Sequence, residues 1–164
     1  MTKKIILISL VSISFIFFHF NAGAKSIIPL KHKTEITNPD PSKDLLIQKL
    51  DELNGFLAAA DYDKAKALFI LPAEISDDVI TGMMKKLIEQ QEISTDGIKI
   101  ISKKGTFGKV ADIFPEKGKM RAEKNKLNPD ECYGIKYQTA EVMAHWDGKE
   151  FKIFRIDDIG KVTE

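Results

Sequence analysis

Three side chains near the carboxyl end of the sequence are of the types that perform acid–base chemistry: Glu141, His145 and Glu150. On a strand, Glu141 and His145 point to the same face, and the hairpin described below places Glu150 opposite His145. A carboxylate beside a histidine can tune its basicity for proton transfer. The alternative is an exposed cross-strand charge pair, worth roughly a few tenths of a kcal/mol. Because the sequence around them supplies no nucleophile or oxyanion donor, we favour the charge pair and assign no catalytic residue.

Metal and nucleotide chemistry have no support in the sequence. Beyond residue 24 the only histidines are His32 and His145, and no spacing of Cys and His indicates zinc. No acidic loop suits calcium, and no glycine-rich phosphate loop or serine elbow is present. We therefore expect neither a metal nor a cofactor.

Charge is distributed unevenly along the chain. Residues 103–126 hold eight basic side chains and three acidic ones, whereas residues 40–96 hold twelve acids and six lysines. A basic surface can dock on an acidic partner protein, although a solvated face is the more common outcome. Aromatic residues that would suit single-stranded nucleic acid are nearly absent there. The candidate partner-binding residues are Lys103, Lys104, Lys119, Arg121 and Lys124.

Residues 1–24 have the pattern of an export signal. Lys3 and Lys4 precede an apolar run, and Ala22-Gly23-Ala24 is a small-residue cleavage site. A signal anchor that stays uncleaved is the alternative. Cleavage would leave 140 of the 164 residues, in which 23 basic groups face 24 acidic ones. That balance favours neither nucleic acid nor an anionic membrane as partner. We expect a periplasmic or secreted protein that does not insert into the membrane after cleavage.

Three helices are predicted in the first half of the domain, after a flexible lead-in over residues 25–39. Asp40-Pro41 starts the first helix, which continues to about residue 60. Asp61 caps the second and Ser76 the third. Their apolar faces recur at helical spacing. The first face comprises Leu46, Leu50, Leu53 and Leu57, the second Ala65, Leu68 and Phe69, and the third Ile80, Met83, Met84, Leu87 and Ile88.

The middle of the chain is predicted to alternate between strands and helices. Residues 98–102 follow an Asp-Gly turn and are predicted to form a strand. Residues 106–114 favour a short helix capped by Thr106, with a strand as the alternative, and residues 116–126 a charged helix. Residues 133–137 alternate as a strand, in which Gly134 marks either a bulge or a close backbone approach. Cys132 is the only cysteine, so no internal disulfide can form. We favour a buried side chain there over a reactive thiol.

The carboxyl-terminal stretch, residues 140–158, is predicted to be a β-hairpin. Asp147-Gly148 suits a two-residue turn, which would place Trp146 opposite Lys149 and Ala144 opposite Phe151. One face of the hairpin is then apolar, and Trp146 belongs to this core face. The opposite face is expected to meet water. The apolar face comprises Ala140, Val142, Ala144, Trp146, Phe151 and Ile153, and the opposite face Glu141, Met143, His145, Glu150 and Lys152.

Two segments resemble the small exported members of the nuclear transport factor-like superfamily, which are cone-shaped, cystatin-like α+β domains. They are Ala60 to Ala65 at a helix junction and Trp146 to Ile153 in the closing strand pair. The resemblance implies a curved sheet with a ligand pocket between helices and sheet. It carries over no catalytic residue, because no buried acid can be placed on a strand.

These patterns predict one α+β domain over residues 40–160. Three N-terminal helices would pack on an antiparallel sheet of about four strands, with a charged helical insertion before the last strands. We expect a binding or inhibitory protein of the cell envelope that acts through contacts with another protein, such as an immunity-type protein. The alternative is a small-ligand-binding protein or enzyme with a pocket between helices and sheet. A filled core and an exposed charged or aromatic patch would favour the first class, and a deep apolar cavity the second.

Overall fold

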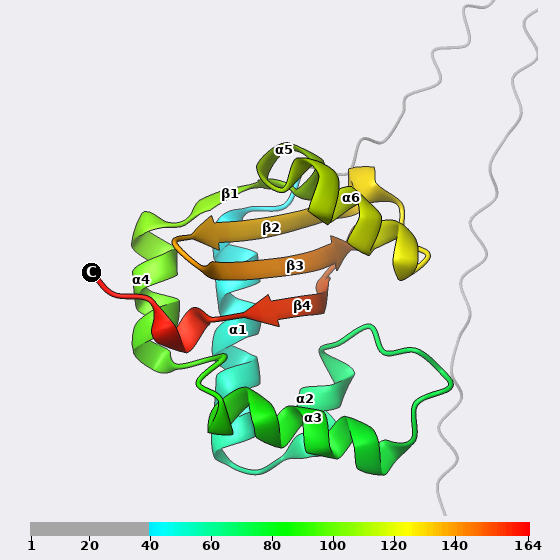
Figure 1. Cartoon of the computed structure of the whole chain (residues 1–164), viewed down its shortest axis with the longest axis vertical. Coiled ribbons are helices and arrows are strands. Elements are labelled where there is room, and N and C mark those ends of the chain that lie inside the picture. The colour runs from blue at the N-terminus through cyan, green and yellow to red at the C-terminus, as the bar shows by residue number, and fades with distance from the viewer. Residues whose placement is uncertain (1–39) are drawn as a thin grey trace, which may run out of the picture. The chain divides into compact units, whose positions relative to one another are not determined.

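The sheet organises the fold of the chain. The computed structural model describes residues 40–164. The expected export signal and lead-in lie outside these residues. The strands are β1 (Thr106–Lys109), β2 (Cys132–Tyr137), β3 (Ala140–Trp146) and β4 (Phe151–Asp157). All neighbouring pairs are antiparallel and the order is β1-β2-β3-β4 (Figure 1). The predicted α+β class and four-stranded antiparallel sheet are therefore confirmed.

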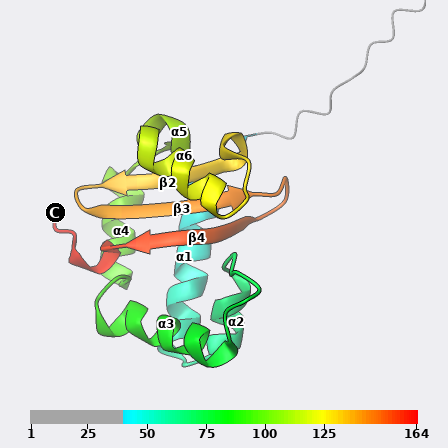
Figure 2. The same ribbon diagram turned by 45° about the vertical axis from the view of Figure 1, so that its right-hand side comes forward.

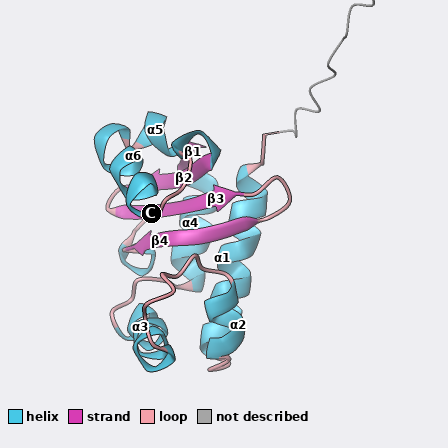
Figure 3. Cartoon of the chain, turned by 90° about the vertical axis from the view of Figure 1, so that its right-hand side faces the viewer, coloured by secondary structure: helices cyan, strands magenta, loops and turns pink. Residues whose placement is uncertain are grey.

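Helices cover both faces of this sheet. The face called inner here packs against α1 (Lys43–Ala58) and α4 (Thr95–Lys104). The outer face lies beneath α5 (Val110–Ile113) and α6 (Pro115–Lys124), as Figure 3 shows. Beside the edge strand β4 lie α2 (Tyr62–Ala67) and α3 (Asp77–Glu89) (Figure 2). Short 3-10 turns at Pro129–Glu131 and Ile159–Lys161 complete the described part.

The predicted apolar faces of the first two helices are largely buried. Leu46, Leu50 and Leu53 of α1 are fully buried, and Leu68 at the end of α2 is nearly so. Asp61 caps α2 as expected, accepting a hydrogen bond from the backbone N–H of Lys64. The predicted cap of α1 is wrong: Ser42 caps it, and Asp40 instead accepts a hydrogen bond from the hydroxyl of Tyr133.

A fourth helix precedes the sheet where a strand was predicted. The strand prediction for residues 98–102 is wrong, because the hydroxyl of Ser94 accepts a hydrogen bond from Gly97 N–H and starts α4 there. Ile98 and Ile101, three residues apart, are then both buried on one helix face. Gly97 allows close packing: a Cβ atom there would lie 1.8 Å from the carbonyl oxygen of Ile159. It does not form a turn.

The segment after α4 is part strand and part helix. The helix predicted from Thr106 begins four residues later, because Thr106–Lys109 pairs with β2 as strand β1. Val110 and Phe114 lie in and just after α5 and are buried, as their helical spacing predicted. The charged helix is confirmed as α6. Together α5 and α6 form an insertion between β1 and β2.

The predicted hairpin exists, but its turn is longer than expected. Trp146 pairs with Phe151 rather than with Lys149, so four residues connect the strands. The carboxylate of Asp147 holds this loop, because it accepts hydrogen bonds from the N–H groups of Lys149 and Glu150 at 2.9 and 2.8 Å. The error in register is two residues, which leaves the side chains from Ala144 to Ile153 on their predicted faces. A bulge next to Met143 and Ala144 adds one further residue to β4.

The two faces of the hairpin differ from expectation in their exposure. Ala144, Phe151 and Ile153 of the apolar face are buried, and Trp146 at its end is half-buried. The prediction that the other face meets water is wrong for Met143, which is fully buried under α5 and α6. Cys132 is buried in the same outer cluster, as favoured, and burial raises the pKa of its thiol to about 12. The thiol is therefore protonated at neutral pH.

Replacing Trp146 with alanine should destabilise the protein by about 3 kcal/mol. This value is at the lower end of the range for removing a large aromatic side chain from a core, because the ring of Trp146 is only partly buried. Its centroid lies 5.0 Å from that of Phe151, and its Nε1 is buried without a hydrogen-bond partner among the described residues. Trp146→Phe keeps the ring contact and removes the unpaired N–H, so it should cost less than about 1 kcal/mol. Urea denaturation of both variants measures this, and an unchanged Trp146→Ala would refute the packing role.

Candidate functional site

The three acid–base candidates have separate partners. His145 Nε2 lies 3.3 Å from the carboxylate of Glu131, because β3 pairs His145 with Lys152 and not with Glu150. Glu150 instead contacts the ammonium groups of Lys152 at 3.0 Å and Lys49 at 3.6 Å. The predicted pairing of Glu150 with His145 is therefore wrong. Glu141 lies at the far end of β3 with cationic partners of its own.

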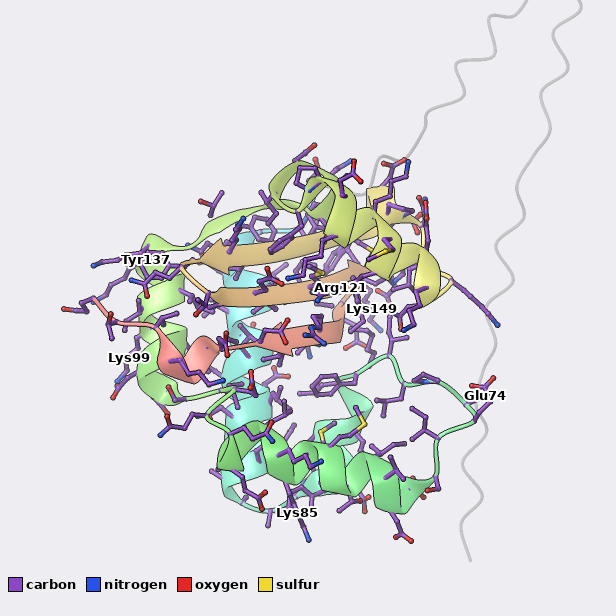
Figure 4. The ribbon with its side chains drawn as sticks, viewed as in Figure 1. Glu74, Lys85, Lys99, Arg121, Tyr137 and Lys149 are labelled. Atoms are coloured by element: carbon purple, nitrogen blue, oxygen red, sulfur yellow. The ribbon has the colours of Figure 1, made fainter. Side chains whose placement is uncertain are left out.

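Glu141 joins the outer face of the sheet to α6. Its carboxylate accepts hydrogen bonds from Lys117 at 2.5 Å and from Arg121 at 3.1 Å. Burial favours the neutral acid and acts to raise the pKa of Glu141, but the two cations outweigh burial and lower it. Figure 4 shows Arg121 over the outer face, where it also lies 3.6 Å from Asp157. The geometry gives Glu141 a structural role in holding α6.

Glu141→Gln should lower the free energy of unfolding by about 1 kcal/mol at pH 7, because the charged hydrogen bonds to Lys117 and Arg121 are lost. Since the pKa of Glu141 is lowered in the folded state, its stabilising contribution is complete above the unfolded-state pKa. It disappears as the pH falls through the folded-state pKa. The difference between wild type and variant in urea denaturation should therefore shrink as the pH falls below the ordinary pKa of a glutamate. Glu150→Gln is the matched control, and an equal loss there would contradict the assignment.

A polar hollow of about 410 Å³ adjoins His145. Asp40, Glu131, Tyr133 and Asp147 also line it. The hydroxyl of Tyr133 donates to Asp40 at 2.7 Å, and burial together with this bond raises the pKa of Tyr133 to about 12. In residues 40–164 no group of His, Cys, Asp and Glu side chains is arranged to hold a metal ion. The hollow brings carboxylates, a lysine, a tyrosine and a histidine together.

The five candidate partner-binding residues lie on two faces of the molecule. Lys103 and Lys104 end α4 on the side of the inner face, whereas Lys119, Arg121 and Lys124 belong to α6 over the outer face. Arg121 is held by Glu141 and Asp157, while no ion pair within the described part engages the four lysines. Only the residues of α6 can therefore act together.

A second hollow is an apolar groove between α3 and the edge strand β4, with a volume of about 420 Å³. The connection between α2 and α3 forms its end. Met83 on its α3 side is 44% exposed, and Asn125 places the end of α6 at its rim. We call this feature the α3–β4 groove. Its apolar lining includes Phe69, Leu71, Ile75, Met83, Leu87 and Phe154.

One feature of the sequence relates to this groove, but the helical spacing of its residues led us to assign them all to the core. The third predicted helix has a five-member apolar stripe, assigned to the core as a whole. In the structure Ile80 and Met84 are buried, but Met83 and Ile88 are 44% and 43% exposed. Met83 lines the groove, whereas Ile88 does not. The breadth of the stripe, which exceeds what one contact face requires, was therefore the available sign that part of it stays uncovered.

No segment of residues 40–164 forms a helix with the length and apolarity of a membrane span. The features available for function are thus the α3–β4 groove, the polar hollow and the lysines of α6. Comparison of the chain with protein-family models, curated proteins and solved structures gave no match.

Proposed function

We propose that this chain is an exported protein of the cell envelope, periplasmic or secreted, that binds or inhibits another protein through the α3–β4 groove. An immunity-type protein that masks an exported toxin is one concrete form of this activity. An accessory of envelope stress or assembly is another. The export part of the proposal comes from the sequence of residues 1–24, and the binding part from the groove.

The single observation that carries the proposal is the uncovered apolar surface along α3. Side chains of this kind are normally buried in a small domain, and apolar patches left uncovered commonly mark interaction sites. Met83 is exposed on the helix and lines the groove, together with apolar side chains of β4 and of the α2–α3 connection. Methionine is flexible and polarizable, which suits it to binding surfaces.

The packing of the inner face weighs against the competing function. A small-ligand-binding protein or enzyme of the expected kind would keep a pocket between α1, α4 and the sheet. Instead Leu50, Ile101 and Val142, from α1, α4 and β3, are each 0% exposed. Descent from the nuclear transport factor-like superfamily stays a proposal. The ligand pocket that this resemblance implied would lie at the inner face, which is filled by buried side chains.

Affinity capture of the mature protein from envelope extract, followed by mass spectrometry, tests the proposal. Wild type should retain a specific partner that Met83→Asp loses. The matched control is Leu45→Asp, since Leu45 on α1 is also apolar and 42% exposed but does not line the groove. Equal recovery by both variants would remove the groove from the interface, and capture of no partner by wild type would count against the function.

The export proposal has its own test. Intact-mass analysis of the protein recovered from the envelope or medium should show a chain that begins at Lys25, because the cleavage site precedes that residue. A mass that includes residues 1–24, found in a membrane fraction, would overturn the proposed localisation.

A further inference from the structure

The groove adjoins an open edge of the sheet. Residues 68–70 run parallel to β4 at Ile153, which donates to Leu68 O and accepts from Ile70 N–H, both at 2.8 Å. Beyond β4, Glu92 engages the N–H groups of Asp158 and Ile159. Between these two points, nothing within residues 40–164 forms a backbone hydrogen bond to residues 154–157 from the side opposite β3. At about 3.3 Å per residue, this open edge is about 13 Å long.

This edge already accepts one short parallel bridge, at Phe69, from the chain itself. Pairing of residues 68–70 stops before Pro72, which has no N–H to donate, and the chain then turns toward α3. The apolar lining of the groove lies directly beside the edge, since Phe154 and Ile156 of β4 are among the residues that line it. An extended peptide would therefore satisfy the open backbone groups and bury alternate side chains in the groove.

The uncompensated charge around the groove is positive. Glu92 is paired with Lys161 at 3.0 Å, and Asp157 with Arg155 and Arg121. Lys86 lines the groove on α3, and it forms no ion pair with any described residue. Asn125 lines the opposite rim of the groove, and its two neighbours in the sequence, Lys124 and Lys126, are both basic. Acidic residues in the occupant would complement these lysines. The chain's own lead-in, residues 25–39, does not have this acidic character, because it holds Lys25, Lys31 and Lys33 against Glu35.

We propose that the occupant of the α3–β4 groove is an extended segment of a partner protein, with alternating apolar side chains and acidic residues at one end. It pairs its backbone with residues 154–157 and so extends the sheet beyond β4. This inference rests on the proposed protein-binding function and specifies the partner's chemistry. A lipid chain would fill the groove but leave the strand edge unpaired.

A labelled synthetic peptide tests the inference with the mature protein. The probe alternates valine and threonine and ends in two glutamates. We expect saturable binding, weakened about tenfold by Met83→Asp or by replacing the glutamates with lysines, and unchanged by Leu45→Asp. Hydrogen exchange should slow in the complex for those amides of residues 154–157 that point away from β3, because these N–H groups gain partners.

Two N-methylated copies of the probe identify the mode of binding. Each copy blocks the N–H groups along one edge of the peptide. One copy should lose binding and the other keep it. No saturable binding below about 1 mM, or binding that leaves exchange at residues 154–157 unchanged, overturns the proposal. Binding of oleate without the peptide would assign the groove to lipid. A partner captured through Met83 with a failed peptide probe would overturn only this inference, and the proposed function would stand.

Discussion

Replacing Gly134 with alanine should destabilise the protein by about 3 kcal/mol, because the added methyl group has no space in the centre of the sheet. A Cβ atom there would lie 2.4 Å from the carbonyl oxygen of Val142 and 2.9 Å from Cε2 of Phe114. The backbones of β2 and β3 must separate to relieve the first contact, and the ring of Phe114 must shift to relieve the second. Of the two alternatives that the sequence leaves open for Gly134, a bulge or a close backbone approach, the structure has the close approach.

Urea denaturation measures this effect, and the chain supplies a matched control. Gly55 lies in α1 with nothing within 4 Å of its added Cβ. Gly55→Ala should therefore raise stability by about 0.5–1 kcal/mol through helix propensity. Two glycine-to-alanine changes of opposite sign would support the packing of α5 on the sheet. A Gly134→Ala protein as stable as wild type would contradict it.

Met83→Asp should weaken binding of the partner by about 2–4 kcal/mol, the range for a central apolar contact of an interface. The variant places a carboxylate inside the apolar groove, where binding would remove it from water without a hydrogen-bond partner. Its effect on folding should stay within about 0.5 kcal/mol, because the side chain is already 44% exposed. Titration calorimetry against the captured partner gives the affinity, and urea denaturation gives the stability.

Leu45→Asp again provides the comparison, since it adds the same charge at an equally exposed apolar position away from the groove. It should leave the affinity unchanged. If both variants weaken binding alike, the loss follows from net charge and the groove has no special role. If neither variant does, the partner binds elsewhere.

Local patterns predicted most of the fold, and the errors have identifiable physical causes. The leucine spacing of residues 46–57 matched α1, because one face of that helix lies in the core, and the alternation of residues 133–137 matched β2, because Tyr133 and Ile135 lie on the inner face of the sheet. The segment that forms α4 was predicted as a strand because Gly97 suggested a turn before it. Gly97 instead allows the helix to pack closely against Ile159, 62 residues later in the sequence. Such long-range contacts are not encoded in local periodicity.

The candidate site was less predictable than the fold. The proposed relation of His145 to Glu150 depended on the hairpin register, and the four-residue loop held by Asp147 moved Glu150 away. Glu131, the observed partner of His145, comes from a turn before β2. The α3–β4 groove depends on which part of the methionine-rich stripe remains uncovered. That depends on how the α2–α3 connection and α6 pack around β4.

Site-specific photo-crosslinking tests the central claim, that α3 and β4 form a protein-binding groove, most directly. A photoreactive amino acid is placed at Met83 in one version of the full-length protein and at Leu45 in another, and both are irradiated in intact cells. We expect one discrete crosslinked product from the Met83 version, containing a second protein, and none from the Leu45 version. Crosslinks from Leu45 alone, or the same products from both positions, would contradict a binding function for the groove.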